Sequence, residues 1–517
     1  MKNLSLANIA AAAGGQYVGP AEMQSFEVTA IESDSRKVPK GGLFVAIKGE
    51  RVDGHKFIDQ VIANGAAAVL SEIDLGEKPF PYIRVGSSLQ AVKDIAEFYL
   101  KQLHIPVIGI AGSVGKTSTK EMAYSVLRQK FNVLKTEGNF NNELGVPLTI
   151  FRLRDEHEMA VLEMGISDFG EMHRLAKIVR PNTVIMTNIG YCHLENLIDR
   201  DGILKAKTEI FDFLESDAHI ILNGDDDKLA TITDVRGIKP VTFGFAPERD
   251  IWADELKSLG LKGTACHFHT PVGDFHATVG MPGRHMVANA LAGTAVGLAY
   301  GLTLDQIKTG IEANESLSGR FNIIDTDRYT IIDDCYNANP VSMKASLEVL
   351  QDGANRRVAI LGDMGELGEN EKALHAEVGA FAAGLNIDAI YCAGPLSEAI
   401  SDEAKKTATP KDIRHFATRA ELMEALPTLL HDGDTILVKA SHFMQFTQIV
   451  DLLRKQSQRV NRSTGQRVFW GGLMGLLGSV LGPKSLKTIH LFNPLNPIYT
   501  YLKINYKKID DNGFLMD

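Results

Sequence analysis

The chain has 517 residues and a mass of 56.4 kDa, which is too long for one hydrophobic core and predicts two to four domains. A hydrophobic content of 44% and a charged content of 23% are ordinary for a globular protein. The net charge of -10 argues against a general nucleic-acid binder. The four cysteines form no Cys-x-x-Cys pair, so we expect neither a disulfide framework nor a cysteine zinc site, and a reducing cytoplasm fits.

The first hundred residues read as a small α/β module. An alanine-rich amphipathic helix ends at Gly14 and is not a signal peptide. Alternating and apolar runs then predict strands at 26–31, 42–47 and 66–70 and a helix at 53–65. The loop between the first two strands carries Ser35 and Arg36, a hydroxyl and a guanidinium fork that suit a pyrophosphate. From these residues alone, a solvated turn is the simpler interpretation.

The segment 105–117 predicts a strand, a phosphate loop and the start of a helix. Gly112 and Gly115 allow successive backbone N–H groups, including those of Ser113, Val114 and Ser118 at the helix start, to point at phosphate oxygens. Lys116 can reach the outer phosphates, and the Thr117 hydroxyl can ligate Mg²⁺. The first glycine, Gly109, stands one position earlier than in the usual Walker pattern, and a chance glycine turn is the alternative. The stretch nevertheless predicts an ATP site.

Further candidates follow the phosphate loop along the chain. Residues 136–147 are dense in amides and glycine and end in Pro147, a helix-limiting residue, so they predict a loop. Glu163 ends a buried strand beside the phosphate loop, where a Mg²⁺ ligand is needed, although it could instead cap a helix. His193 follows another strand, where a lone histidine is more often structural. Lys205 and Lys207 share a charged helical face, and from the pattern alone both should be solvated.

The last third of the chain alternates strands and helices, which predicts an α/β domain with a mostly parallel sheet. Arg320 precedes it at an expected hinge, where it could equally be an exposed arginine. A polar loop containing Tyr336, Asn337 and Asn339 lies between a strand and a helix.

Several motifs together resemble the Mur ligases, and among them those that add D-alanyl-D-alanine. They are Gly-x-x-Gly-Ser-x-Gly-Lys-Thr at 109–117, Gly-Asn-x-Asn-Asn-x-x-Gly-x-Pro at 138–147 and Asp-x-Tyr-Asn-Ala-Asn-Pro-x-Ser-Met at 334–343. The resemblance spans about residues 20–455. Two positions depart from the family pattern: Met286 stands where an asparagine is common, and His442 where an arginine is usual.

The resemblance implies roles for individual residues. Catalytic roles are implied for Lys116, Lys207, Arg320 and His193, with Lys207 carbamylated by CO₂. Thr117, Glu163, His193 and Lys207 are implied as metal ligands or ligand supports. The nucleotide contacts implied are Gly112, Ser113, Val114, Gly115, Lys116, Thr117, Ser118, Asn289 and Asp334. The substrate contacts implied are Ser35, Arg36, Asn139, Asn141, Asn142, Tyr336, Asn337 and Asn339.

The resemblance also implies the fold and the reaction. We expect an α/β protein with the three-domain Mur ligase architecture: a UDP-substrate domain at 1–104, a central phosphate-loop ATPase domain at 105–316, a Rossmann-like C-terminal domain at 317–455 and an unassigned tail at 456–517. The implied reaction is ATP- and Mg²⁺-dependent: D-alanyl-D-alanine is joined to UDP-N-acetylmuramoyl-tripeptide through an acyl phosphate, in peptidoglycan synthesis.

Two alternatives remain from the sequence. One is a ligase that adds a single amino acid or resembles folylpolyglutamate synthetase; the other is a phosphate-loop NTPase acting as a switch or scaffold. We expect a cytoplasmic monomer. The tail contains an apolar glycine-rich run at 468–481 that is too short for a confident membrane span, although weak peripheral contact remains open.

Overall fold

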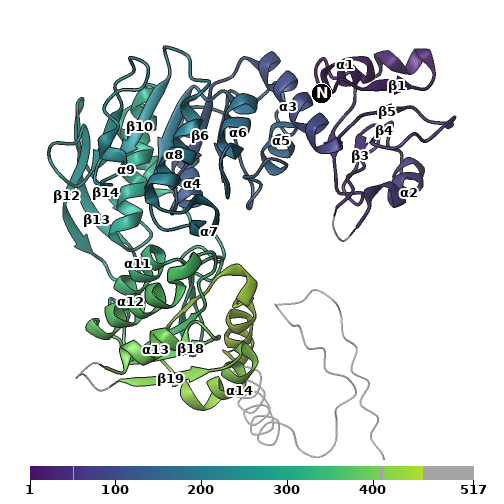
Figure 1. Cartoon of the computed structure of the whole chain (residues 1–517). Coiled ribbons are helices and arrows are strands. Elements are labelled where there is room, and N and C mark those ends of the chain that lie inside the picture. The colour runs from purple at the N-terminus through teal and green to yellow at the C-terminus, as the bar shows by residue number, and fades with distance from the viewer. Residues whose placement is uncertain (50–51, 407–410, 458–517) are drawn as a thin grey trace, which may run out of the picture. The chain divides into compact units, whose positions relative to one another are not determined.

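A computed structural model describes residues 1–49, 52–406 and 411–457, and these residues form three sheets (Figure 1). The tail predicted from residue 456 lies outside the described residues except for its first two positions. Within the described residues, the helices are all too short or too polar to cross a bilayer. The four cysteines are free thiols.

The first sheet has five strands in the order β1-β5-β4-β3-β2, and it confirms the small α/β module predicted for this segment. Its elements are α1 (Leu6–Ala12), β1 (Gln16–Val18), β2 (Ile31–Glu32), β3 (Leu43–Val45), α2 (Ile58–Ala63), β4 (Ala68–Ser71), β5 (Tyr82–Arg84) and α3 (Ser88–Leu103). Helix α3 contacts α1 on one side and α5 and α6 of the next segment on the other, so it links the first sheet to the second.

The predicted strand at 26–31 is wrong over most of its length. Only Ile31 and Glu32 form a strand, paired in parallel with β3. The backbone of Phe26 and Val28 instead bonds Leu6 and Leu4, at 3.1 Å in both cases. Since the chain enters helix α1 at Leu6, this pairing cannot extend into a ladder.

The second sheet has nine strands in the order β14-β13-β12-β11-β10-β9-β6-β8-β7. Strands β6 to β12 run parallel, and β13 and β14 add antiparallel to β12. Its elements are β6 (Val107–Ala111), α4 (Lys116–Leu127), β7 (Val133–Lys135), α5 (Gly145–Ile150), β8 (Met159–Glu163), α6 (Glu171–Val179), β9 (Thr183–Met186), α7 (Leu194–Leu197), α8 (Arg200–Thr208), β10 (His219–Asn223), β11 (Val241–Gly244), β12 (Ile251–Ser258), β13 (Thr264–Thr270), β14 (Gly273–Val279), α9 (Arg284–Ala299) and α10 (Leu304–Glu312).

The central strands β6, β8 and β9 are buried at every position, which explains why they are largely apolar. Ile108 and Ile110 of β6 pack in the core that also holds residues of α4 and α9. Val107 and Ala111 of the same strand face the core that holds residues of α6 and α8. The alternation places the carboxyl end of β6, and with it the phosphate loop, between two helical layers.

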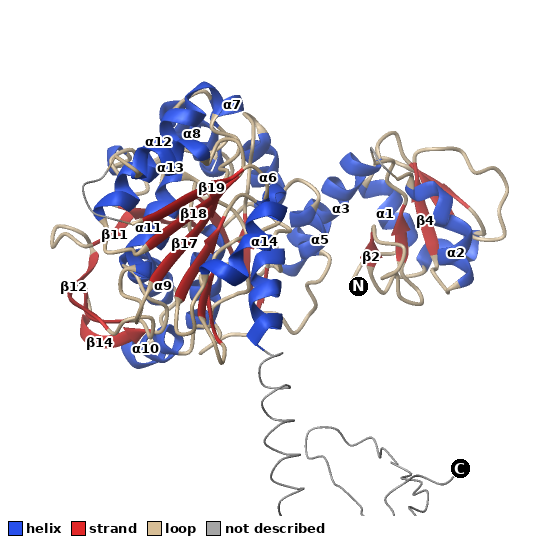
Figure 2. Cartoon of the chain, turned by 90° about the horizontal axis from the view of Figure 1, so that it is seen from below, coloured by secondary structure: helices blue, strands red, loops and turns tan. Residues whose placement is uncertain are grey.

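The third sheet has six strands in the order β15-β16-β20-β17-β18-β19, and all pairs except β15 with β16 are parallel. This confirms the mostly parallel sheet, and helices lie on both sides of it (Figure 2). Its elements are β15 (Asn322–Asp325), β16 (Thr330–Asp333), α11 (Pro340–Leu350), β17 (Arg357–Gly362), α12 (Glu371–Gly384), β18 (Ala389–Ala393), α13 (Glu398–Ala404), β19 (Asp412–Phe416), α14 (Arg419–Leu429) and β20 (Thr435–Lys439). The proposed domain boundaries at 104/105 and 316/317 remain predictions.

One predicted loop contains a helix. Residues 136–147 are predicted to form a loop because Pro147 limits helices, but α5 begins at Gly145 and includes Pro147 in its first turn. Proline is tolerated there because the first N–H groups of a helix have no partner within it. The Asn142 side chain accepts hydrogen bonds from the N–H groups of Leu144 (3.2 Å) and Gly145 (2.8 Å), which fixes the start of the helix.

Candidate functional site

The phosphate loop lies between β6 and α4 with a backbone that requires glycine at two positions. Gly112 has φ of +144° and Gly115 has φ of +83°. A Cβ on Gly112 would come within 2.0 Å of the Thr187 Oγ1 atom, so a side chain cannot be accommodated without moving the loop. The close approach to β9 therefore explains the glycine at this position.

The segment after β9 is hydrogen-bonded to the phosphate loop. The Val114 N–H donates to Asn188 Oδ1 at 3.0 Å, while the Val114 carbonyl accepts from Asn188 Nδ2 at 3.0 Å and from Thr187 Oγ1 at 2.6 Å. Ser113 Oγ donates to the Gly190 carbonyl at 3.2 Å. Sequence reasoning missed Thr187 and Asn188; the available signal was a polar pair at the end of a buried strand.

The cationic side chain of the loop is turned toward its own backbone. Lys116 Nζ donates to the Gly112 carbonyl at 2.9 Å and to the Ser113 carbonyl at 3.2 Å. Thr117 is nearly buried at the start of α4. The ammonium therefore stands beside the glycines whose N–H groups would face phosphate oxygens.

Glu163 occupies the carboxyl end of β8, and its carboxylate has one free oxygen. Asn141 Nδ2 donates to Glu163 Oε1 at 2.8 Å, whereas Glu163 Oε2 is buried with no hydrogen-bond partner among the described residues. A buried carboxylate oxygen without a donor is costly unless a cation or another donor meets it. This arrangement favours the metal-ligand interpretation over the helix cap.

Lys207 is fully buried on α8, in contrast to the solvated face expected from the pattern alone. Its Nζ has no hydrogen-bond partner among the described residues. Burial, with a smaller effect of the Lys116 charge, lowers the pKa of Lys207 to about 8. Near neutral pH, a much larger fraction of Lys207 is therefore in the neutral amine form than of an ordinary lysine.

His193 precedes α7 with a left-handed backbone, φ of +51°. Its Nδ1 lies 2.6 Å from Glu366 Oε2, and the Leu194 N–H donates to the Glu366 carbonyl at 3.1 Å. The hydrogen bond with His193 holds the pKa of Glu366 below its usual value. Glu366 was not singled out from the sequence, because it lies far along the chain in the loop after β17.

The hinge before the third sheet places Arg320 against an aromatic ring. The Arg320 guanidinium lies 3.8 Å from the centroid of the Tyr336 ring. The His442 ring also lies near Tyr336, with the two ring centroids 5.7 Å apart. Gly319, with φ of +73°, donates its N–H to Asp333 Oδ2 at 2.8 Å. The turn thus fixes the entry of Arg320 into the cavity described below.

Asp334 is held by the protein at both carboxylate oxygens. Oδ1 accepts from the Phe321 N–H at 3.1 Å, and Oδ2 accepts from Ser346 Oγ at 2.7 Å and from Lys439 Nζ at 2.5 Å. Lys439 is buried and also donates to the Asn337 carbonyl at 3.0 Å. Asp334 therefore joins the hinge, α11 and the end of β20.

Two of the implied contacts also have clear local roles. The Asn339 side chain accepts from the Ser342 N–H at 2.8 Å in a capping box at the start of α11. Asn289 Oδ1 accepts from Thr119 Oγ1 at 2.9 Å, and its Nδ2 lies 3.4 Å from Met286 Sδ. Met286 thus meets the amide of Asn289 where the family pattern has a second asparagine.

A single cavity of about 970 Å³ brings most of the predicted residues together. It is lined by Ser113, Val114, Gly115, Lys116, Thr117, Ser118, Asn139, Asn141, Asn142, Glu163, His193, Asn289, Arg320, Asp334, Tyr336, Asn337 and Asn339. Gly112 and Lys207 are not among the residues that line it. The phosphate loop, the amide-rich loop and the Tyr336–Asn339 loop therefore share one space.

Ser35 and Arg36 are not brought to this cavity. The Arg36 side chain belongs to the segment of the first sheet and is 82% exposed. Its Nε donates to Asp34 Oδ1 at 2.9 Å and its Nη2 to Asp34 Oδ2 at 2.8 Å. These bonds lower the pKa of Asp34 to about 2. The fork that could hold a pyrophosphate is therefore engaged by a neighbouring carboxylate in this structure.

Comparisons with known proteins agree with the motifs. Family models match three successive segments: "Mur ligase family, catalytic domain" at 27–116, "Mur ligase middle domain" at 110–297 and "Mur ligase, glutamate ligase domain" at 319–442. The UDP-N-acetylmuramoyl-tripeptide--D-alanyl-D-alanine ligase of Bacillus subtilis is 35% identical over 450 residues, covering 86% of this chain and 96% of that protein.

Solved structures give the same result. MurF from Acinetobacter baumannii superposes with a TM-score of 0.78 at 33% identity, covering 86% of this chain and 97% of that chain. MurF ligase from Thermotoga maritima in complex with ADP gives 0.74 at 30% identity, covering 83% and 98%. With relatives this similar over most of its length, and with the expected three-domain Mur ligase architecture in place, the chain belongs to the Mur ligase family.

Proposed function

We infer that this chain is an ATP-dependent, ADP-forming ligase that joins D-alanyl-D-alanine to the terminal carboxylate of UDP-N-acetylmuramoyl-tripeptide. The observation that carries the inference is the shared cavity. The two loops whose motifs resemble the D-alanyl-D-alanine-adding ligases line the same space as the phosphate loop. Both the B. subtilis relative and the A. baumannii structure are named for this activity or for MurF.

The reaction requires a carboxylate to be made electrophilic. A carboxylate oxygen of the acceptor attacks the γ-phosphorus of ATP, ADP leaves, and an acyl phosphate forms. The neutral dipeptide amine then attacks the acyl carbon and gives up one proton to solvent, and phosphate leaves with the oxygen that came from the acceptor. Both steps require that the phosphate charge be neutralised and that the reacting groups be oriented, and neither step requires a protein nucleophile.

Lys116 and Arg320 both line the cavity and supply positive charge to it. Lys116 belongs to the phosphate loop and needs only to exchange its two carbonyl partners for phosphate oxygens. The Arg320 guanidinium lies over the Tyr336 ring, and no ion pair is found for it among the described residues. Its charge is therefore available to the transferring phosphoryl group.

The donor set fits Mg²⁺. Hard cations take hydroxyl and carboxylate oxygens; Thr117 and Glu163 both line the cavity, and the buried Oε2 of Glu163 has no hydrogen-bond partner among the described residues. His193 is proposed as a further ligand, with Glu366 holding its Nδ1 as second-sphere carboxylates commonly do. Bound Mg²⁺ would neutralise phosphate charge and orient the nucleotide.

We propose that Lys207 becomes carbamylated. Its neutral amine would attack CO₂, a nitrogen–carbon bond would form, and one proton would leave to solvent. The product is an anion, which suits a support for Mg²⁺ beside Lys116. The proposal is supported by the buried, unpartnered amine and its lowered pKa.

The remaining roles are substrate contacts. Asn139, Asn141 and Asn142 are proposed to position the acceptor and amine from one wall. Tyr336, Asn337 and Asn339 are proposed to do so from the other, and Asn289 and Asp334 to flank the nucleotide. Ser35 and Arg36 are proposed to contact the uridine diphosphate, which would require Arg36 to exchange Asp34 for a phosphate oxygen. A cytoplasmic location and a monomeric state remain predictions.

The test is product formation with matched amines. The full chain is incubated with ATP, Mg²⁺ and UDP-N-acetylmuramoyl-tripeptide, together with D-alanyl-D-alanine, single amino acids or no amine, and the products are identified by mass spectrometry. An adduct with the dipeptide alone is expected. An adduct with a single amino acid would favour the first alternative, and ATP hydrolysis without any adduct would favour an NTPase.

A further inference from the structure

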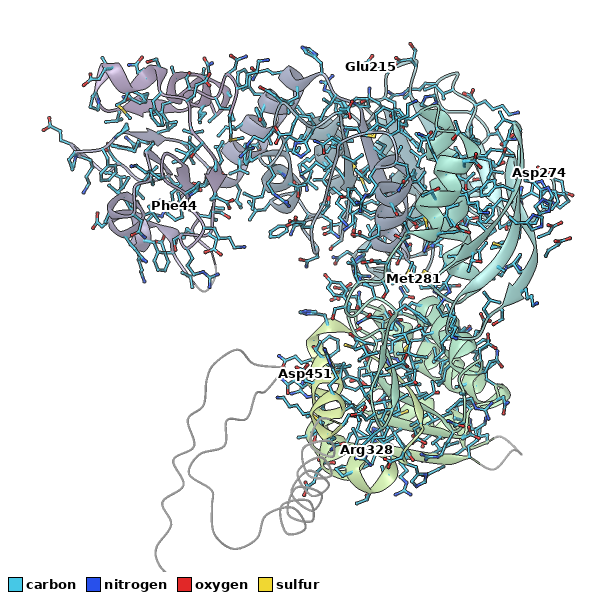
Figure 3. All side chains as sticks on the ribbon, turned by 180° about the vertical axis from the view of Figure 1, so that it is seen from behind. Phe44, Glu215, Asp274, Met281, Arg328 and Asp451 are labelled. Atoms are coloured by element: carbon cyan, nitrogen blue, oxygen red, sulfur yellow. The ribbon has the colours of Figure 1, made fainter. Side chains whose placement is uncertain are left out.

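A cluster of histidine and acidic side chains stands on the antiparallel part of the second sheet, outside the cavity. Cross-strand pairing sets Asp254 of β12 opposite His267 of β13, and His267 opposite His276 of β14. A second row on the same face consists of Trp252, His269 and Asp274. Asp274 marks the place in Figure 3, at the outer margin of these strands.

The cluster contains a compact set of three ligand atoms. Asp254 Oδ1 lies 3.0 Å from His269 Nε2 and 3.6 Å from His267 Nδ1. All three atoms lie within 4.8 Å of one another. Ligand atoms about 2.1 Å from a tetrahedral Zn²⁺ stand about 3.4 Å apart, so the two measured distances bracket the required spacing.

The local backbone is shaped to present these side chains. The register of β12 against β13 shifts between Asp254 and Lys257, and Glu255 in this bulge has φ of +48°. A bulge re-aims a side chain and is often found at functional positions. Here it brings Glu255 to 3.5 Å from His276, so consecutive acidic residues of one strand both meet histidines.

The rings are also held in place. The Trp252 and His269 rings stack with centroids 3.8 Å apart and planes 14° apart. His269 Nε2 shares a hydrogen bond with Asp254 Oδ1 at 3.0 Å, and Asp274 Oδ2 lies 3.3 Å from His269 Nδ1. A metal ion at Nε2 would replace that hydrogen bond and leave the ring proton on Nδ1, facing Asp274. A carboxylate beside the non-ligating nitrogen is the usual support of a metal-binding histidine.

We propose that Asp254, His267 and His269 form a binding site for a divalent transition-metal ion of the Zn²⁺ class, separate from the nucleotide cavity. Two imidazoles and one carboxylate suit Zn²⁺ or Co²⁺ and not Mg²⁺, which prefers oxygen ligands. Three protein ligands leave the fourth position to water. The bound ion links β12 to β13 and stabilises the antiparallel part of the sheet. The proposal does not depend on the ligase activity.

Trp252 provides a direct probe, because the chain has only one other tryptophan, Trp470. In a Trp470→Phe background with excess Mg²⁺, Co²⁺ is titrated against tryptophan fluorescence, and Zn²⁺ is then added as a competitor. Saturable quenching with one equivalent of Co²⁺, reversed by Zn²⁺, is expected. Thermal unfolding of the same protein should shift upward with Zn²⁺.

Variants decide which residues bind. Asp254→Asn keeps the shape of the side chain and should weaken Co²⁺ binding at least tenfold, as should His267→Ala. His173→Ala is the matched control, because His173 forms a similar surface pair with Asp212 at 2.6 Å but has no third ligand among the described residues; it should change nothing. Ligase turnover should be unaffected in all of them. Equal Co²⁺ affinity in Asp254→Asn and the parent, or quenching that Zn²⁺ does not reverse, would overturn the proposal.

Discussion

Replacing the buried lysine of α8 by a neutral side chain should stabilise the protein while abolishing its activity. Lys207 has its pKa lowered by burial from 10.5 to about 8, and its Nζ has no partner among the described residues. Each pKa unit corresponds to about 1.4 kcal/mol, so this shift amounts to about 3 kcal/mol of penalty on the protonated form. Methionine has similar length and no charge, and it therefore removes that penalty.

The sign follows from proton binding in the two states. The unfolded lysine holds its proton up to about pH 10.5, whereas the folded lysine loses it near pH 8. The penalty is thus complete below pH 8 and disappears as the pH rises toward 10.5. At pH 7 and without CO₂, Lys207→Met should raise the free energy of unfolding by up to about 3 kcal/mol, and its advantage should shrink at alkaline pH.

The assay is urea unfolding of both proteins in CO₂-free buffer at several pH values. Lys205→Met is the control, since Lys205 lies exposed on the same helix and its loss should change stability by less than about 0.5 kcal/mol. Turnover of Lys207→Met should be lost, and a ¹³C carbamate NMR signal seen in the parent with labelled bicarbonate should be absent. A variant that is less stable at pH 7, or whose advantage does not change with pH, would refute the reasoning.

Three further substitutions test the cavity. Lys116→Ala should lower dipeptide-dependent phosphate release by at least about 100-fold while changing the free energy of unfolding by less than about 1 kcal/mol, because only bonds to its own loop are lost; comparable turnover would exclude Lys116 from the phosphate site. Gly112→Ala should weaken ATP binding, measured by calorimetry, since its Cβ would meet Thr187 at 2.0 Å; Gly86→Ala, where no atom lies within 4 Å, should bind normally. Lys439→Met leaves the Asp334 carboxylate without its buried cation and should cost about 3 kcal/mol in urea unfolding, partly restored by adding Asp334→Asn; an unchanged stability would mean that the pair contributes nothing.

The sequence was sufficient for the phosphate loop because its constraints are local. The loop comes directly after an apolar strand and leads into a helix, and its glycines, Lys116 and Thr117 lie within a few residues of one another. The structure has β6 before this stretch and α4 beginning at Lys116. The apolar strands likewise predicted the two α/β sheets that follow. The strand expected at 26–31 failed because its partner is the N-terminal segment, a pairing between distant residues that the alternation of one segment cannot show.

Burial and long-range pairing account for the rest of what the sequence could not show. Lys207 has a charged neighbour on a polar helix, and only the packing of α8 shows that it is buried. The contact of His193 with Glu366 joins residues 173 positions apart. The run His267-Phe-His269 was visible in the sequence, but its acidic partner depends on the register of β12 and on the bulge at Glu255.

The most direct test of the ligase reaction follows one oxygen atom. UDP-N-acetylmuramoyl-tripeptide labelled with ¹⁸O in its terminal carboxylate is incubated with the enzyme, ATP, Mg²⁺ and D-alanyl-D-alanine, and the released phosphate is analysed by mass spectrometry. One ¹⁸O atom from the acceptor should appear in each phosphate, and only as the dipeptide adduct forms. Phosphate whose new oxygen comes from water, with the label left in the acceptor, would contradict the acyl phosphate and identify simple ATP hydrolysis instead.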